Sequence, residues 1–271
     1  RVSASTALLF SWESWWALEG EGRPSEALRY LDQVHAAHRA LVAAGVTVDV
    51  VRPGTDLSSY NLIIVPALHL VRDGEADAIA FAAERGASVL ITFASGTVNE
   101  NDRVGLGGYP AAFRDLLGLR VEEFAPLRPD TTVTLSDGTV GSVWSERLAV
   151  VDAEVITTFV DGPAQGSAAI TRRAHGAGTA WYLATSPDDT SYLALVQRIV
   201  AEAGVPQLLP DHGRLDLIRR AGEGRSILFA INHTAEDATI TAHGHDLVHQ
   251  ESVAGSVTIP AGGVRIIEES A

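Results

Sequence analysis

The sequence predicts an α/β fold, namely an open, doubly wound and mainly parallel sheet, followed by a small all-β antiparallel sandwich domain. Three observations predict it. Short apolar runs alternate with helical patterns over the first 120 residues. These runs are rich in Val, Ile and Leu on both faces, as in parallel strands that helices cover on both sides. Beyond the stretch 205–210, only short β-like runs follow.

The first domain is expected to begin with four buried strands. They span residues 7–10, 46–51, 62–65 and 88–93. Helices are expected at residues 24–44, 73–85 and 110–117. Pro24 lies near the first turn of the first helix, and Gly45, Gly86 and Gly118 each follow the end of one helix. Strands that alternate with helices in this order favour a flavodoxin-like or Rossmann-like sheet, the former being related to the class I amidotransferase fold.

The pattern then changes to hairpins. Residues 131–173 alternate Thr and Val around Asp137-Gly138 and Asp161-Gly162, which are turn signals between antiparallel strands. A core strand is expected again at 180–184 and a last helix at 191–203.

The domain boundary is expected at the Pro-rich stretch 205–210. We therefore predict a first domain at residues 1–205 and a small β sandwich at residues 211–271. Its expected strands span residues 214–219, 226–231, 238–242, 256–259 and 264–268.

Composition excludes several functions. The net charge is −14, and no arginine cluster offers a basic face, so no nucleic-acid partner is expected. The absence of Cys and Lys excludes disulfides, thiol nucleophiles and Schiff-base chemistry. No long uncharged apolar run exists, so no membrane span is expected, and we expect no cofactor. Because residue 1 is not Met, we expect the gene's own N-terminus to lie outside this sequence.

The most distinctive segment follows the first expected strand. Three of the five tryptophans, Trp12, Trp15 and Trp16, fall within five residues there, with Glu19 just beyond them. Indole rings are enriched where one surface meets another. The segment 11–23 is expected to be a loop, and the loop 94–110 follows another strand. Both should lie at the carboxyl edge of the sheet, where open α/β sheets bind ligands.

The second loop is dense in polar side chains, among them Asn99, Asn101, Asp102 and Arg103. We expect these side chains to fix the loop through turn hydrogen bonds and to hold Arg103 for a charge partner. The spacing of an EF-hand is absent, and we expect no metal there.

Three other patterns carry possible chemistry. Ser95 follows a core strand, but Phe93 and Thr97 stand where a nucleophile elbow has glycines. Glu122 and Glu123 are adjacent, so on a regular strand they point to opposite faces and share no site. Three histidines lie within seven residues of the second domain, and the sequence leaves open whether they bind metal. They are His243, His245 and His249.

Several motifs resemble the glycoside hydrolase family 42 β-galactosidases. The motifs are FSWESWWALE at 10–19, YNLIIVPAL at 60–68, SGTVNENDRV at 95–104, LGGYP at 106–110 and WYLAT at 181–185. They occur in the order of the family's second domain, and the tail from Gly213 is similar to its small C-terminal domain. Members of the family carry both catalytic glutamates on a (β/α)8 barrel, which this sequence does not contain.

The resemblance implies a function. The chain would be the non-catalytic oligomerisation and active-site-rim part of a retaining β-galactosidase, which hydrolyses terminal β-galactosides in carbohydrate metabolism. Its partners would be two further copies in a homotrimer, the catalytic barrel and, through the whole enzyme, the galactoside. No catalytic residue is assigned to this chain, and a cytoplasmic location is expected. The interface or sugar-rim candidates are Trp12, Trp15, Trp16, Glu19, Asn99, Asn101, Asp102 and Arg103.

Two alternatives stay open. One is a stand-alone hydrolase of amidotransferase-like fold that uses Ser95 as nucleophile. The other is a carbohydrate-binding module whose tryptophans form the platform for a sugar.

Overall fold

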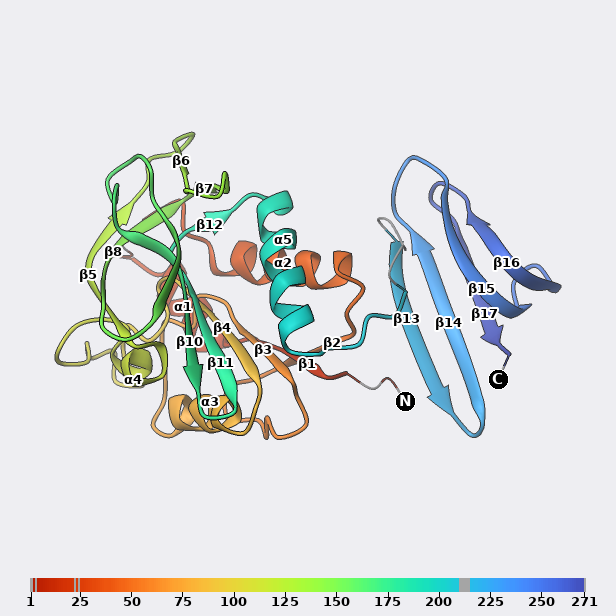
Figure 1. Cartoon of the computed structure of the whole chain (residues 1–271), viewed down its shortest axis with the longest axis horizontal. Coiled ribbons are helices and arrows are strands. Elements are labelled where there is room, and N and C mark those ends of the chain that lie inside the picture. The colour runs from red at the N-terminus through yellow and green to blue at the C-terminus, as the bar shows by residue number, and fades with distance from the viewer. Residues whose placement is uncertain (1, 3, 22, 24, 210–214, 271) are drawn as a thin grey trace.

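A computed structural model describes residues 2, 4–21, 23, 25–209 and 215–270 of the chain. Figure 1 shows an α/β domain and a smaller β domain side by side, joined by the segment that follows the last helix. The two domains have separate hydrophobic cores. Pro24 and residues 210–214, on which part of the expected helix start and part of the expected boundary fall, lie outside the described residues.

The α/β domain is built on one seven-stranded sheet. Its strands are β1 Thr6–Leu9, β2 Val48–Val51, β3 Leu62–Val65, β4 Ser88–Thr92, β9 Glu154–Thr158, β10 Ala168–His175 and β11 Gly178–Leu183. They lie in the order β2-β1-β3-β4-β11-β10-β9. The first five of these run parallel, and β10 and β9 add an antiparallel edge. The strands predicted at the start of the chain and at 180–184 are therefore confirmed.

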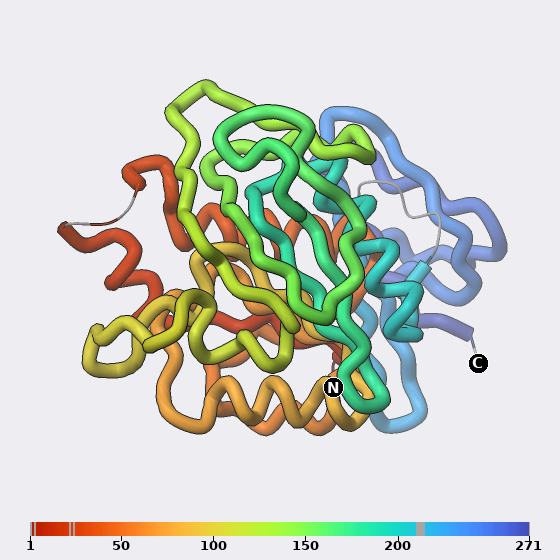
Figure 2. The backbone as a smooth tube through the Cα atoms, turned by 60° about the vertical axis from the view of Figure 1, so that its left-hand side comes forward, coloured from red at the N-terminus to blue at the C-terminus, as the bar shows by residue number. Residues whose placement is uncertain are grey.

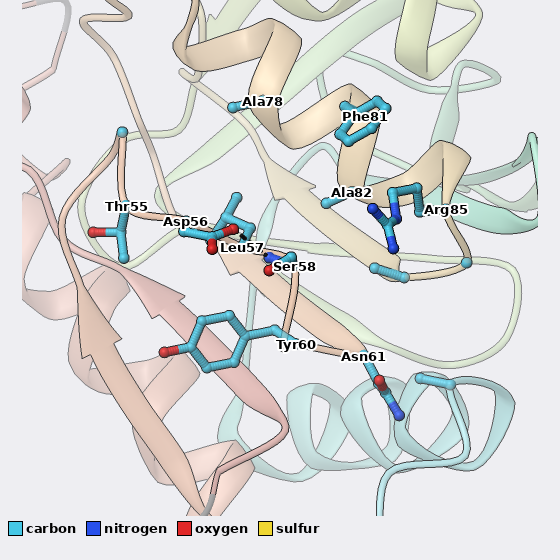
Figure 3. Close-up of a pocket in the computed structure, with 14 residues that line it drawn as sticks. Thr55, Asp56, Leu57, Ser58, Tyr60, Asn61, Ala78, Phe81, Ala82 and Arg85 are labelled. Atoms are coloured by element: carbon cyan, nitrogen blue, oxygen red, sulfur yellow. Dashed lines mark hydrogen bonds between the residues drawn. The ribbon is translucent and has the colours of Figure 1, made fainter.

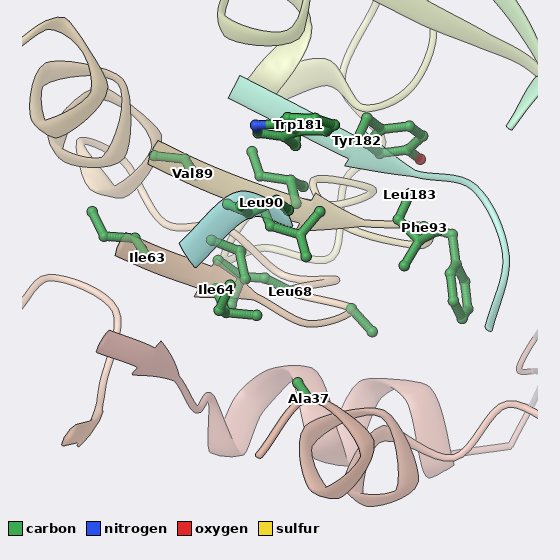
Figure 4. Packing of buried hydrophobic residues seen from close by; sticks show 14 of the residues in the cluster. Ala37, Ile63, Ile64, Leu68, Val89, Leu90, Phe93, Trp181, Tyr182 and Leu183 are labelled. Atoms are coloured by element: carbon green, nitrogen blue, oxygen red, sulfur yellow. The ribbon is translucent and has the colours of Figure 1, made fainter. Parts of the chain in front are cut away.

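Helices cover both faces of this sheet. Their bounds are α1 Trp12–Glu19, α2 Tyr30–Ala43, α3 Glu75–Glu84, the 3-10 turn η1 Ala111–Phe113, α4 Arg114–Leu117 and α5 Asp189–Glu202. Figure 4 shows the sheet between α2 and α3, with Ile63, Leu90 and Trp181 packed in the core. The predicted helix at 24–44 is shorter than expected, because Arg29 is extended and caps a helix that begins at Tyr30.

Two smaller antiparallel sheets accompany the seven-stranded sheet. The strands β5 Leu119–Pro126 and β8 Trp144–Val150 pair with each other, and β6 Thr132–Thr134, β7 Val140–Ser142 and β12 Ser186–Pro187 form a second small sheet. The hairpins predicted within 131–173 are confirmed. The sequence pattern did not indicate β5, which alternates exposed and buried residues only over its first half.

The second domain is all antiparallel. Its strands are β13 Leu215–Gly222, β14 Arg225–Asn232, β15 Ala238–Asp246, β16 Glu251–Ile259 and β17 Val264–Glu269. They form a single sheet in the order β13-β14-β17-β15-β16, and side chains from all five strands enclose one core. The expected two-sheet sandwich is thus a single bent sheet of sandwich-like form, since β15 pairs with β17 only near one end.

Candidate interface at the carboxyl edge of the sheet

The tryptophan segment forms a helix, which corrects the expectation of a loop at 11–23. Ser11 is the N-cap of α1, and its hydroxyl accepts a hydrogen bond from the Ser14 backbone N–H at 3.1 Å. The Ser11 N–H in turn donates to the Tyr30 hydroxyl at 2.7 Å, which ties the start of α1 to α2. The serine at the N-cap, a residue favoured at helix starts, explains the difference.

The helix places the three indoles on one face, since positions i, i+3 and i+4 are neighbours on a helix. The ring centroids of Trp12 and Trp15 are 5.3 Å apart, and those of Trp12 and Trp16 are 6.3 Å apart. Phe10 packs edge-on against Trp12 at 5.1 Å. We call these four rings the aromatic face. Trp15 packs against the core, but Trp12 is 54% exposed and Trp16 is 65% exposed.

Glu19 closes the helix rather than joining the aromatic face. Its carboxylate lies 3.8 Å from the Arg29 guanidinium, and its backbone carbonyl accepts a hydrogen bond from Arg23 at 3.3 Å. Both contacts fix the chain where it turns back after α1. The geometry therefore gives Glu19 a local structural role.

The loop with Asn99 is fixed as the sequence predicts. The Asn99 side-chain oxygen accepts hydrogen bonds from the N–H groups of Asn101 at 3.0 Å and Arg103 at 3.1 Å. Asn101 also donates to Glu100 at 3.2 Å, and Asp102 takes a left-handed conformation with φ 57°. Within the described ranges, no carboxylate lies within salt-bridge distance of Arg103.

A third segment joins the two predicted ones. Ser14 exchanges hydrogen bonds with the backbone of Leu70, at 3.1 Å from the Leu70 N–H and 3.3 Å to its carbonyl. Arg72 pairs with Glu13 at 2.7 Å, and the Val71 N–H donates to the Val98 carbonyl at 3.0 Å. Figure 2 shows the early segment with α1 and the loop near residue 100 on the same side of the molecule. The two motifs therefore belong to one surface, which residues 68–72 bridge.

This surface has features that sequence reasoning missed. A small cavity of about 190 Å³ lies beside Trp12, between Arg52 and Arg72. Two apolar side chains of the polar loop also point to solvent, since Val104 is exposed and Leu106 is 92% exposed. An isolated leucine between glycines was the available signal. Both belong to the loop that the hydrogen bond between the Val71 N–H and the Val98 carbonyl joins to residues 68–72.

The turn after β4 lacks the geometry of a serine hydrolase. Ser95 is only 2% exposed, and its hydroxyl accepts a hydrogen bond from the Leu68 N–H at 3.0 Å. The residue with positive φ, which a nucleophile elbow requires, is Ala94 at φ 60°. The residue at the place of a nucleophile is therefore Ala94, one position before Ser95, and alanine has no nucleophilic group.

A buried carboxyl group lies under this turn. Glu146 is fully buried and accepts hydrogen bonds from the Tyr182 hydroxyl at 2.5 Å, the Trp144 indole N–H at 2.9 Å and the Ala94 N–H at 3.5 Å. No cation pairs with it among the described residues. Burial raises the pKa of Glu146 to about 7, although these hydrogen bonds lower it in part. No sequence pattern indicated this burial, because Glu146 lies in a strand directly before the charged Arg147.

The remaining candidates from the sequence, two glutamates on β5 and three histidines of the second domain, do not form a site together. A bulge between Val121 and Glu123 makes β5 irregular, which corrects the assumption of a regular strand, yet Glu122 pairs with Arg120 and Glu123 with Arg147. In the second domain, the His249 ring lies 3.0 Å from the Asp246 carboxylate. Over the part of the chain that the structure describes, no three His, Asp or Glu side chains are grouped closely enough to hold an ion.

Removing the helix cap tests the origin of α1. We expect Ser11→Ala to lower the free energy of unfolding by about 1 kcal/mol, because the Ser14 N–H loses its acceptor at a buried helix start. Urea denaturation followed by circular dichroism measures this. The exposed Ser59, in the loop before β3, offers a matched Ser→Ala control that should leave the midpoint unchanged. An equal stability of the two variants would contradict a capping role.

Two family profiles match the chain. The β-galactosidase trimerisation domain of glycoside hydrolase family 42 matches residues 4–206, and the β-galactosidase C-terminal domain of the same family matches residues 214–269. Together they extend over both domains described above.

Individual β-galactosidases are similar to this chain in sequence and in structure. A β-galactosidase of Arthrobacter sp is 46% identical over 99% of this chain and 39% of its own length, and one of Planococcus sp. is 35% identical over 98% and 41%. A crystal structure of β-galactosidase from Bacillus circulans sp. alkalophilus superposes with a TM-score of 0.93 at 33% identity, over all of this chain and 42% of its own. The chain thus spans about two fifths of the length of these relatives. No helix among the described residues is long and apolar enough to cross a membrane.

Proposed function

Because this chain belongs to the glycoside hydrolase family 42 β-galactosidases and carries their trimerisation and C-terminal domains, we propose that it joins three subunits and rims the neighbouring active site. In this role the chain is not catalytic itself. Hydrolysis of terminal β-galactosides would take place on the part of the whole protein that this chain does not contain. The nucleophile position after β4 carries Ala94, which supports a role without chemistry.

The aromatic face carries this proposal. Indoles are costly to leave in water, and protein–protein contacts concentrate on tryptophan anchors. Trp12 and Trp16 expose more than half of their surface, and Leu106 on the neighbouring loop is almost fully exposed. Arg103, which makes no ion pair with a described residue, would then meet a carboxylate of the partner subunit. Trp15, Asn99, Asn101 and Asp102 would hold these groups in place, and Glu19 would hold the end of α1.

Two structural proposals accompany it. We propose that the first domain, residues 1–205, is related to flavodoxin-like and class I amidotransferase-like folds. The five parallel strands lie in the order β2-β1-β3-β4-β11. Numbered along the chain this is the order 2-1-3-4-5 of flavodoxin-like sheets, which supports this relation. We also propose residues 211–271 as a separate second domain, which the two separate cores support. A cytoplasmic location of the whole protein stays a prediction, which cell fractionation would test.

The mass in solution tests the assembly role. We expect light scattering on a size-exclusion column to give about three times the chain mass of 28.6 kDa. The same sample should release no product from a chromogenic β-galactoside. A monomer at every concentration would show that these residues are not sufficient for assembly, and turnover by the pure chain would contradict the non-catalytic role.

A further inference from the structure

A second hollow lies at the opposite edge of the sheet. A solvent-open cavity of about 520 Å³ is lined by the loop 54–61 and by the C-terminal half of α3 (Figure 3). The loop leads into β3, and the end of α3 leads into β4, so the cavity lies at the amino edge of these parallel strands. The aromatic face follows the carboxyl end of β1, so the two sites are separate. The volume falls within the range of small-molecule sites.

The cavity is open because its lining residues are small. Glycine and alanine supply much of the wall, from the loop, from α3 and from the end of α5. They are Gly54, Ala78, Ala82, Gly86, Ala87 and Ala203. The buried side chain of Leu57 closes the floor. Side chains of ordinary size at these positions would fill the space, as they do in packed interiors.

A carboxylate and a guanidinium face each other across the cavity. Figure 3 shows Asp56 reaching in from the loop and Arg85 from the end of α3. The Ser58 N–H donates to one carboxylate oxygen of Asp56 at 2.9 Å, which orients the group. The pKa of Asp56 is lowered, chiefly by the hydrogen bonds from Ser58 and in smaller part by the charge of Arg85. Arg85 makes no ion pair with any described residue, so both groups have hydrogen-bonding capacity left.

An aromatic ring completes the wall. Phe81 is 57% exposed on α3, and the Arg85 guanidinium carbon lies 5.7 Å from the centre of its ring. On the other side, the Tyr60 hydroxyl donates to Asp49 at 3.1 Å, which fixes the Tyr60 ring. An exposed aromatic face beside a carboxylate and a guanidinium is what the apolar C–H face and the hydroxyl rim of a pyranose require.

We propose that this cavity binds one pyranose ring of a mono- or disaccharide. Sugar hydroxyls both donate and accept, so neighbouring hydroxyls can donate to Asp56 and accept from Arg85, while the C–H face lies on Phe81. An anion would be repelled by Asp56 and a cation by Arg85. A purely apolar ligand would leave both groups without partners. The site goes beyond the assembly role and does not depend on it, because none of its residues lies on the aromatic face.

Saturation-transfer NMR of the full chain with lactose and with galactose tests the site. We expect a saturation-transfer signal from the sugar with the unaltered chain. In Phe81→Ala and in Arg85→Gln the affinity for the sugar should fall by roughly tenfold or more. Both side chains are surface groups whose loss leaves the core intact. Ala78→Leu is a second kind of variant, since it keeps every polar group and fills the cavity on a helix that tolerates leucine. It should abolish binding with an unchanged circular dichroism spectrum.

Trp16→Ala is the matched control, because it removes an equally exposed aromatic ring from the other edge of the sheet. It should bind lactose as the unaltered chain does. No signal from the unaltered chain would overturn the proposal, as would binding that survives Phe81→Ala and Ala78→Leu. Loss of binding in Trp16→Ala would also overturn it and place the sugar on the aromatic face. The particle mass is measured separately, so failure of the sugar site and failure of the assembly role give different results.

Discussion

Replacing Trp12 and Trp16 together by alanine should dissociate the proposed trimer into monomers at concentrations where the unaltered chain is associated. Anchoring tryptophans commonly contribute about 2 kcal/mol or more each to an interface, and every 1.4 kcal/mol is about a tenfold change in a dissociation constant. The monomer itself should keep its stability, because both side chains are more than half exposed and their removal opens no internal cavity. Light scattering and urea denaturation measure the two effects.

The control for this experiment is another exposed aromatic residue. Phe81 on α3 has a similar exposed fraction and lies at the opposite edge of the sheet, so Phe81→Ala should leave the mass at three chains. Trp15 is unsuitable, because it packs against the core and its loss would lower the stability of the monomer. If the double tryptophan variant keeps the mass and dissociation constant of the unaltered chain, the aromatic face serves something other than assembly.

Replacing Glu146 by Gln should remove a loss of stability that the unaltered chain shows as the pH rises. The pKa of Glu146 is about 7 in the folded chain against 4.5 for an ordinary glutamate, because its carboxyl group is buried without a cation. Between these two values the folded state binds a proton that the unfolded state has released. The free energy of unfolding therefore falls as the pH rises from 4.5 through 7, and it falls by about 3 kcal/mol in total.

The amide of Gln does not titrate and can replace the hydrogen bonds. Its oxygen can accept from the Trp144 indole, and its N–H can donate to the Tyr182 hydroxyl oxygen. Relative to the unaltered chain, Glu146→Gln should therefore gain stability between pH 5 and pH 8, as urea denaturation at a series of pH values would measure. Glu122→Gln, at an exposed glutamate, should give no such difference. A constant gap between Glu146→Gln and the unaltered chain at all pH values would mean that Glu146 does not titrate in this range.

The sequence predicted most of the fold because its signals are local. The runs at β1, β3 and β4 are apolar on both faces, and Gly86 and Gly118 follow the ends of α3 and α4. Period and turn chemistry are properties of neighbouring residues, so they can be recognised without the partner strands. The helix at 12–19 was missed for a local reason as well. Ser11 was treated as part of a loop, although serine is a favoured helix cap.

The candidate site was predicted only in part. Trp12, Trp16 and Arg103 were recognised from residue type. In the structure both indoles are more than half exposed, and Arg103 makes no ion pair with a described residue. The connection between α1 and the Asn99 loop was not predictable, because it passes through Leu70 and Arg72, which carry no motif of their own. Nor did any pattern indicate that Ala94, rather than Ser95, takes the left-handed conformation.

By itself, then, the sequence determined the alternation of strands and helices, the absence of cysteine and lysine chemistry, and the family to which the chain belongs. Each of these depends on residue type and on short spacings along the chain. Only the tertiary structure decided which charged groups are buried or unpaired. Glu146 and Glu122 have the same chemistry and differ by 24 positions, yet one lies under the β4 turn and the other in water. The cost of burying a charge depends on what packs around it, and those neighbours come from distant parts of the chain.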